Sequence, residues 1–145
     1  ANADSESKSE GRKKVIEFLD NGSLESYAKL FAPNLFADEN RDKKEWVDSA
    51  ARLVLESSNK GLQMAMEAMI HRKDRNHIFE DLDIPYLFVT GRYDEMVPMN
   101  DMLKQAASCR RSMTGLFDHS GHLSMVENPE KLKKVVGEFL RWAYR

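Results

Sequence analysis

The apolar run from Tyr86 to Thr90 limits what this chain can fold into more than any other feature. The run is rich in β-forming residues and has no polar alternation, which is typical of a strand buried on both faces of a sheet. A helical pattern follows from about Asp101 to Ala107, then a weaker strand candidate from Met113 to Phe117 and an amphipathic helix that begins at Pro129. Strand, helix, strand, helix predicts a parallel sheet with right-handed crossovers.

The first half of the chain predicts helices only. Apolar residues at helical spacing predict helices over about 4–19, 24–31, 46–54 and 62–70. The expected boundary signals are a stop at Asn21-Gly22, an N-cap at Ser23, a capping box at Asp42-x-x-Glu45 and a break at Asn59-Lys60-Gly61. We therefore expect an α/β protein in which a helical region, residues 1–82, precedes part of an α/β core, residues 83–145.

The expected core has too few strands to stand alone. Parallel sheets are covered on both faces and need neighbouring strands, so two parallel strands make no stable sheet. We expect the rest of the sheet to precede Ala1. The chain by itself should then aggregate, or give a helical signal without cooperative melting.

Composition excludes several classes of protein. Hydrophobic residues make up 41% of the 145 residues, which is enough for a core, and 22 basic against 24 acidic residues give a net charge of −2. This balance argues against nucleic-acid and membrane-surface binding, and no apolar run approaches the ~20 residues of a membrane span. The single Cys109 excludes an intrachain disulfide, and the polar segment 1–10 is unlike a signal peptide. We expect a cytoplasmic protein.

Two residues carry the predicted chemistry. Asp94 follows the buried strand and Gly91, and His122 follows the next strand candidate and Gly121. Ligands of open α/β sheets bind beyond the carboxyl ends of the strands, where both residues are expected to lie. Asp94 alone is more simply a turn or helix cap, and His122 alone a buried loop histidine. Together they predict the acid and histidine of a nucleophile–histidine–acid triad.

These segments resemble motifs of the α/β-hydrolase fold superfamily. Residues 84–98 resemble its strand-Gly-x-x-Asp-x-x-Val-Pro acid motif, and residues 119–129 its Gly-His motif and the start of its final helix. The helical stretch 4–81 resembles the cap that the family inserts before the acid strand. The family order is nucleophile, acid, histidine. No Gly-x-Ser-x-Gly occurs in the 145 residues, so the resemblance implies that the nucleophile and oxyanion-hole loop lie upstream of Ala1.

The resemblance implies hydrolysis of a carboxylic ester or a related acyl transfer. Asp94 would orient His122, which would act as general base and then general acid, without a cofactor or metal. Met96, Val97 and Leu123 adjoin these residues and are expected to border the substrate cavity.

The remaining histidines are assigned no chemistry. His119 is interpreted as a loop or packing residue. His71 and His77 lack carboxylate or cysteine partners at metal-ligand spacing.

Two other interpretations remain open. One is a non-catalytic ligand-binding protein of the same fold, which an upstream Gly-x-Ser-x-Gly would argue against. The other is a small helical interaction domain in which the motifs are a coincidence; such a domain would be monodisperse and melt cooperatively alone. The expected partners of the enzyme are the N-terminal half of the same protein and a small acyl substrate, with no nucleic acid and no membrane.

Overall fold

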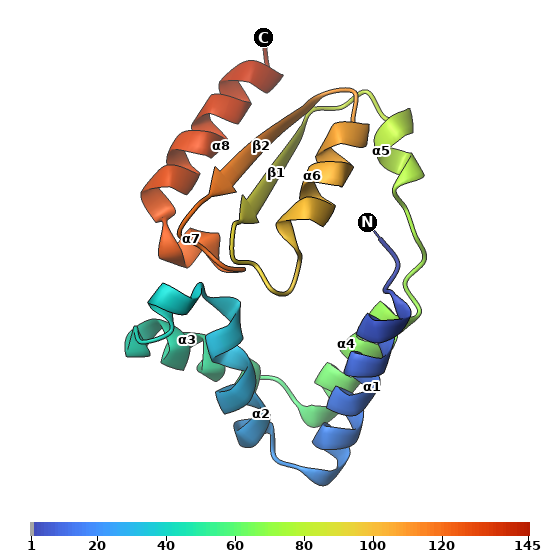
Figure 1. Cartoon of the computed structure of the whole chain (residues 1–145), viewed down its shortest axis with the longest axis vertical. Coiled ribbons are helices and arrows are strands. Elements are labelled where there is room, and N and C mark those ends of the chain that lie inside the picture. Colours follow the sequence, from blue (N-terminus) through green and yellow to red (C-terminus); the bar gives the residue numbers. More distant parts are fainter. Residues whose placement is uncertain (1) are drawn as a thin grey trace.

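The computed structural model describes residues 2–145 and has two parts, a helical half and a sheet half (Figure 1). The helical half contains α1 (Glu6–Asn21), α2 (Leu24–Phe31), the 3-10 helices η1 (Ala32–Leu35) and η2 (Asp38–Asn40), α3 (Lys44–Leu55) and α4 (Asn59–Ile70). The sheet half contains α5 (His77–Asp81), β1 (Tyr86–Gly91), α6 (Met99–Ser108), β2 (Ser112–Phe117), α7 (Ser124–Glu127) and α8 (Pro129–Ala143).

The two strands of the sheet half are parallel, as the sequence predicts. Tyr86 lies opposite Ser112 at one end of the pair, and Gly91 lies opposite Phe117 at the other. The sheet lies between α8 and α6, and both strands end toward the helical half (Figure 1). Phe88 is buried, but its neighbour Leu87 is only partly covered by the described residues. This arrangement agrees with the sequence resemblance to the C-terminal part of an α/β-hydrolase fold.

Several predicted helix boundaries are confirmed. Ser23 caps α2 by accepting a hydrogen bond from Ser26 N, and Asn128 caps α8 by accepting one from Lys131 N. Pro129 occupies the first position of α8, where its missing N–H costs nothing. These helices begin where a side-chain acceptor precedes an amphipathic pattern.

Two boundary predictions in the helical half are wrong. The helix α3 begins at Lys44 after Lys43, which makes no side-chain cap, so the expected Asp42-x-x-Glu45 capping box does not form. Asn59-Lys60-Gly61 is the first turn of α4 rather than a break, because Ser58 Oγ accepts a hydrogen bond from Gly61 N at 3.0 Å. A good N-cap outweighs the low helix propensity of glycine here.

The helical half has its own apolar core in two clusters. Leu19, Tyr27 and Met66 form the first, where α1 packs along α4. Ala32, Phe36 and Ala50 form the second, between η1 and α3, and Leu123 of the sheet half packs against it. The second cluster therefore joins the two halves beside the predicted histidine.

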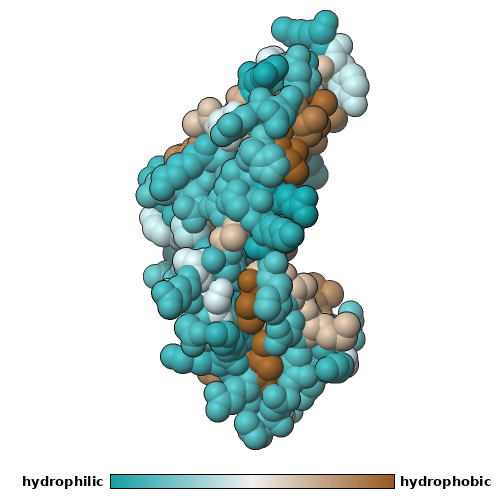
Figure 2. All heavy atoms as spheres, turned by 90° about the vertical axis from the view of Figure 1, so that its right-hand side faces the viewer, coloured by the Kyte–Doolittle hydropathy of each residue, from teal (hydrophilic) through white to brown (hydrophobic). Residues whose placement is uncertain are grey.

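The face of the molecule that Figure 2 shows is mostly hydrophilic. Figure 2 shows a narrow apolar band along the lower half of the molecule, where α1 and α4 lie side by side. Met64 of α4 is 61% exposed, whereas Met66 is buried in the first cluster. Among residues 2–145, no helix is both long and apolar enough to traverse a bilayer.

Candidate active site

The structure brings Asp94 and His122 into hydrogen-bonding contact, although they are separated by 28 positions. Asp94 Oδ2 lies 3.0 Å from His122 Nδ1. The other carboxylate oxygen, Oδ1, accepts hydrogen bonds from the backbone N–H groups of Met96 and Val97, both at 2.8 Å. The Asp94 side chain is 8% exposed and that of His122 is 39% exposed. The acid is thus held rigidly from one side while the imidazole stays accessible.

Close backbone packing allows this contact. A Cβ atom on Gly91 would lie 2.1 Å from the carbonyl oxygen of Gly121, so no larger residue fits at the end of β1. Tyr93 N donates to the carbonyl oxygen of Ser120 at 3.0 Å, which ties the turn after β1 to the loop after β2. No described glycine has a positive φ, so Gly91 is required for space and not for a left-handed turn.

The Asp94 contact determines the chemical state of the imidazole. An ionised carboxylate only accepts hydrogen bonds, so Nδ1 carries the proton and Nε2 of the neutral ring has a free lone pair. The hydrogen bond to Asp94 raises the pKa of His122 above 6.5, and the negative charge of Asp94 adds to the rise, while burial opposes it. The ring is therefore suited to accept a proton at Nε2.

The helical half holds the histidine loop directly. The carbonyl oxygen of Leu35 accepts hydrogen bonds from His122 N at 2.8 Å and from Leu123 N at 3.2 Å. Arg41 pairs with Glu95, the residue after Asp94, at 2.9 Å. The loops of both predicted site residues are thus anchored to the segment between α2 and α3.

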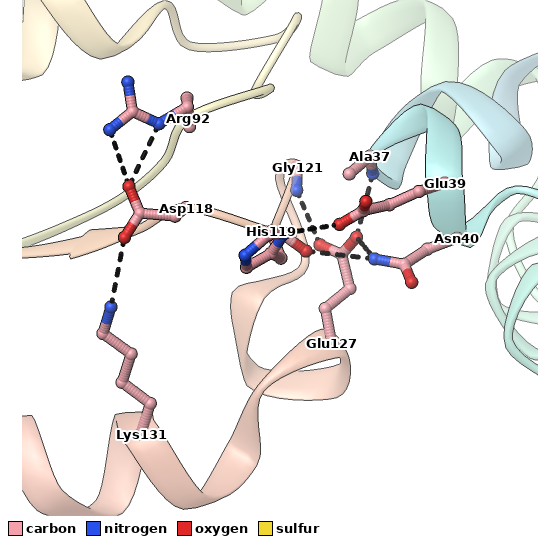
Figure 3. Close-up of polar contacts among 9 residues, drawn as sticks. All are labelled: Ala37, Glu39, Asn40, Arg92, Asp118, His119, Gly121, Glu127 and Lys131. Atoms are coloured by element: carbon pink, nitrogen blue, oxygen red, sulfur yellow. Dashed lines mark hydrogen bonds and ion pairs between the residues drawn. The ribbon is translucent and has the colours of Figure 1, made fainter.

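Glu127 is a site residue that the sequence interpretation missed. Its carboxylate accepts hydrogen bonds from Ala37 N, Asn40 Nδ2 and Gly121 N, at 2.9, 2.8 and 2.7 Å. Figure 3 shows it pointing between the histidine loop and the helical half. The only sequence signal was its place in the Glu127-Asn128-Pro129 motif, which is equally compatible with a simple helix start.

An apolar groove of about 550 Å³ lies between the helical half and the loop after Asp94. Met96 lines this groove, whereas Val97 and Leu123 do not belong to its lining. The apolar lining from the helical half consists of Val15, Phe18, Tyr27, Leu30, Phe31 and Met66. Gly11 of α1 also faces the groove, and a Cβ atom there would meet no atom within 4 Å. The groove can take an apolar group beside the acid loop.

The charged side chains of His119, Arg92 and Asp118 near the site have structural partners. His119 is a loop residue as expected, and its exposed ring pairs with Glu39 Oε1 at 2.9 Å. Arg92 pairs with Asp118 at 2.6 Å, linking the turns after the two strands, and this contact lowers the pKa of the Asp118 carboxyl. Within residues 2–145, no group of at least three histidine, cysteine, aspartate or glutamate side chains is placed to hold a metal ion.

Comparison with solved structures defines the class of protein. The whole chain aligns with 54% of a thermophilic esterase from Thermogutta terrifontis solved with malate bound, with a TM-score of 0.87 and 25% identity. It also aligns over 97% of its length with 53% of MGS-M2, an α/β-hydrolase enzyme from a Medee basin deep-sea metagenome library, with a TM-score of 0.81 and 14% identity. The chain spans about half the length of these enzymes.

Sequence comparison agrees with the structural match. Protein ABHD8 of Bos taurus is 32% identical over 62 residues, which cover 43% of this chain and 14% of that protein. No family model matches the chain. The chain therefore has the fold of the C-terminal portion of an α/β hydrolase.

The site geometry predicts how His122 titrates. Because the hydrogen bond with Asp94 raises its pKa, His122 should titrate above 6.5, and Asp94→Asn should lower that value. The contact should stabilise the folded protein fully below about pH 6.5, and this contribution should be lost as pH rises through the raised pKa. An NMR pH titration of the imidazole measures both values. A wild-type pKa at or below 6.5, unchanged by Asp94→Asn, would contradict the geometry.

Proposed function

We propose that this chain supplies the acid and the histidine of a serine-type α/β hydrolase. The nucleophile would be carried by an N-terminal part of the same protein, and the substrate would be a carboxylic ester or a related acyl compound. The observation that carries the proposal is the 3.0 Å contact between Asp94 Oδ2 and His122 Nδ1 at the carboxyl edge of parallel strands. The order acid before histidine agrees with that of the α/β hydrolases.

The proposed mechanism follows from the fixed tautomer of His122. Nε2 takes the proton of the nucleophile's hydroxyl as the hydroxyl oxygen attacks the acyl carbon, which gives an acyl-enzyme. The imidazolium that forms is stabilised by Asp94 and then donates its proton to the leaving alcohol. A water molecule then attacks the acyl-enzyme and gives its proton to Nε2. The imidazolium returns that proton to the nucleophile's oxygen as the carboxylic acid product is released. The backbone N–H groups of Met96 and Val97 hold the Asp94 side chain in place throughout.

The groove and the helical half supply the proposed binding site for the substrate. We assign Met96 and the apolar side chains of α1 and α2 to the binding of the substrate's acyl group. Residues 1–82 would then act as the cap over a core to which residues 83–145 contribute. Substrate-binding roles for Val97 and Leu123 remain predictions; Leu123 packs against the Ala32, Phe36 and Ala50 cluster instead of lining the groove.

A non-catalytic binding protein of the same fold remains the second candidate. The 145 residues contain no Gly-x-Ser-x-Gly, so the residues upstream of them decide between the two candidates. A groove and an Asp–His pair can persist on a fold that lacks a nucleophile.

Substitutions of the pair test the proposed hydrolase. In the complete protein, His122→Ala should remove nearly all turnover of an activated ester such as a p-nitrophenyl ester. Asp94→Asn should keep the fold but lose on the order of 10⁴-fold in kcat, because the imidazole takes the wrong tautomer. His119→Ala is the matched control, since this exposed histidine of the same loop should be dispensable. Wild-type turnover in His122→Ala would refute the assignment.

Gly11 tests the proposed acyl groove. Gly11→Trp should fill the groove and reduce kcat/KM for octanoate esters by roughly 10-fold or more, while acetate esters are affected less. Gly11→Ala is the control: its methyl group enters open space and should stabilise α1 by about 0.5–1 kcal/mol without altering chain-length preference. An unchanged octanoate-to-acetate ratio in Gly11→Trp would exclude the groove from acyl binding.

A further inference from the structure

The Glu127 carboxylate joins the nearby histidine loop to a segment of the helical half that is far away in the sequence. Oε1 accepts from Ala37 N and Asn40 Nδ2 of the helical half, and Oε2 accepts from Gly121 N, immediately before His122 (Figure 3). Asn40 Nδ2 also donates to the carbonyl oxygen of His119 at 3.1 Å. One carboxylate therefore holds the histidine loop and the 37–40 segment together.

The backbone N–H groups that bind Glu127 are buried, and the segments that carry them are closely packed. Ala37 and Gly121 are buried, so loss of the carboxylate would leave two buried backbone N–H groups without this partner. A Cβ atom on Gly121 would lie 2.8 Å from Ala37 N, so the two segments touch without a side chain between them. Within residues 2–145, no basic side chain forms a salt bridge with Glu127. Its hydrogen bonds are all to neutral N–H donors, which fits a role in holding geometry.

We infer that Glu127 is a positioning residue for His122, and that through it the 37–40 segment of the helical half sets the position of the imidazole. The adjacent bonds from His122 N and Leu123 N to the Leu35 carbonyl oxygen strengthen the same link. Movement of the helical half that admits or releases a substrate would then move His122 relative to the nucleophile. The catalytic part of this inference rests on the proposed function, but the positional part does not.

The simpler alternative is that Glu127 only stabilises the start of α8. In that case, substitution of Glu127 would lower the melting temperature but leave the pKa of the His122 imidazole unchanged. The two roles are distinguished by the pKa of His122 and by the balance between kcat and KM. The charged groups near the ring must be unchanged in the comparison; these are Asp94, the His119–Glu39 pair, the Arg41–Glu95 pair and the Arg92–Asp118 pair.

The test is Glu127→Gln in the complete protein. Glutamine has the same size, but its amide NH₂ cannot accept a hydrogen bond. The NH₂ group would therefore face the backbone N–H of Gly121 or Ala37, donor against donor. We expect a loss in kcat on the order of 10²-fold with a smaller change in KM. The pKa of His122, measured by NMR, should move toward 6.5 as its contact with Asp94 loosens.

Glu130→Gln is the matched control. Glu130 lies three residues away in the first turn of α8, is exposed and pairs with Lys133 at 2.7 Å. The substitution makes the same change in charge and size, and it should leave kcat and the His122 titration unchanged.

Asn40→Ala tests the same link from the helical half. It removes the hydrogen bonds to Glu127 and to the His119 carbonyl oxygen. It should lower kcat and the pKa of His122, both by less than Glu127→Gln does. The effects of Asn40→Ala and Glu127→Gln on kcat should be less than additive in the double variant.

The outcomes separate the two proposals. A Glu127→Gln protein that melts at a lower temperature but keeps wild-type kcat and His122 titration would overturn the positioning role. If that variant does not fold, unchanged readouts in Asn40→Ala would overturn it instead. If His122→Ala keeps full turnover while Glu127→Gln still shifts the His122 titration, the hydrolase assignment fails and the positioning role stands.

Discussion

The close approach of two backbone segments, Gly91 at the end of β1 and Ser120-Gly121 after β2, underlies the rest of the site. Gly91 can come this near because it has no side chain, as its 2.1 Å hypothetical Cβ contact demonstrates. The approach brings the turn that carries Asp94 against the loop that carries His122. Parallel pairing of the strands places both ends at one edge, and glycine removes the steric barrier between them. The hydrogen bond between Asp94 and His122 then forms at 3.0 Å.

The second constraint is the junction between the two halves. In the chain from Leu35 to Arg41, a carbonyl oxygen and a guanidinium bind the loops of His122 and Asp94. A backbone N–H and an amide side chain of the same segment bind Glu127, and the amide also binds the histidine loop. This junction couples the helices that line the groove to the imidazole of His122. In α/β hydrolases whose caps move, a connection of this kind would let substrate entry and the placement of the base be linked.

The sheet half was largely predictable from sequence because its signals are local. An apolar run gives β1, and Asn128-Pro129 gives the start of α8. The Asp94–His122 contact was also predictable, since consecutive parallel strands end at the same edge. The start of α3 was not, because Lys43 has no capping side chain and tertiary packing decides where that helix begins. The role of Glu127 was hidden because its three donors come from segments whose proximity depends on the tertiary fold.

Covalent labelling of the complete protein with a fluorophosphonate tests the central claim most directly. The account predicts one phosphonylated serine, located by peptide mass spectrometry outside the 145 residues of this chain, and loss of labelling in His122→Ala. Labelling of a serine within these residues, or labelling that persists unchanged without the imidazole, would contradict it.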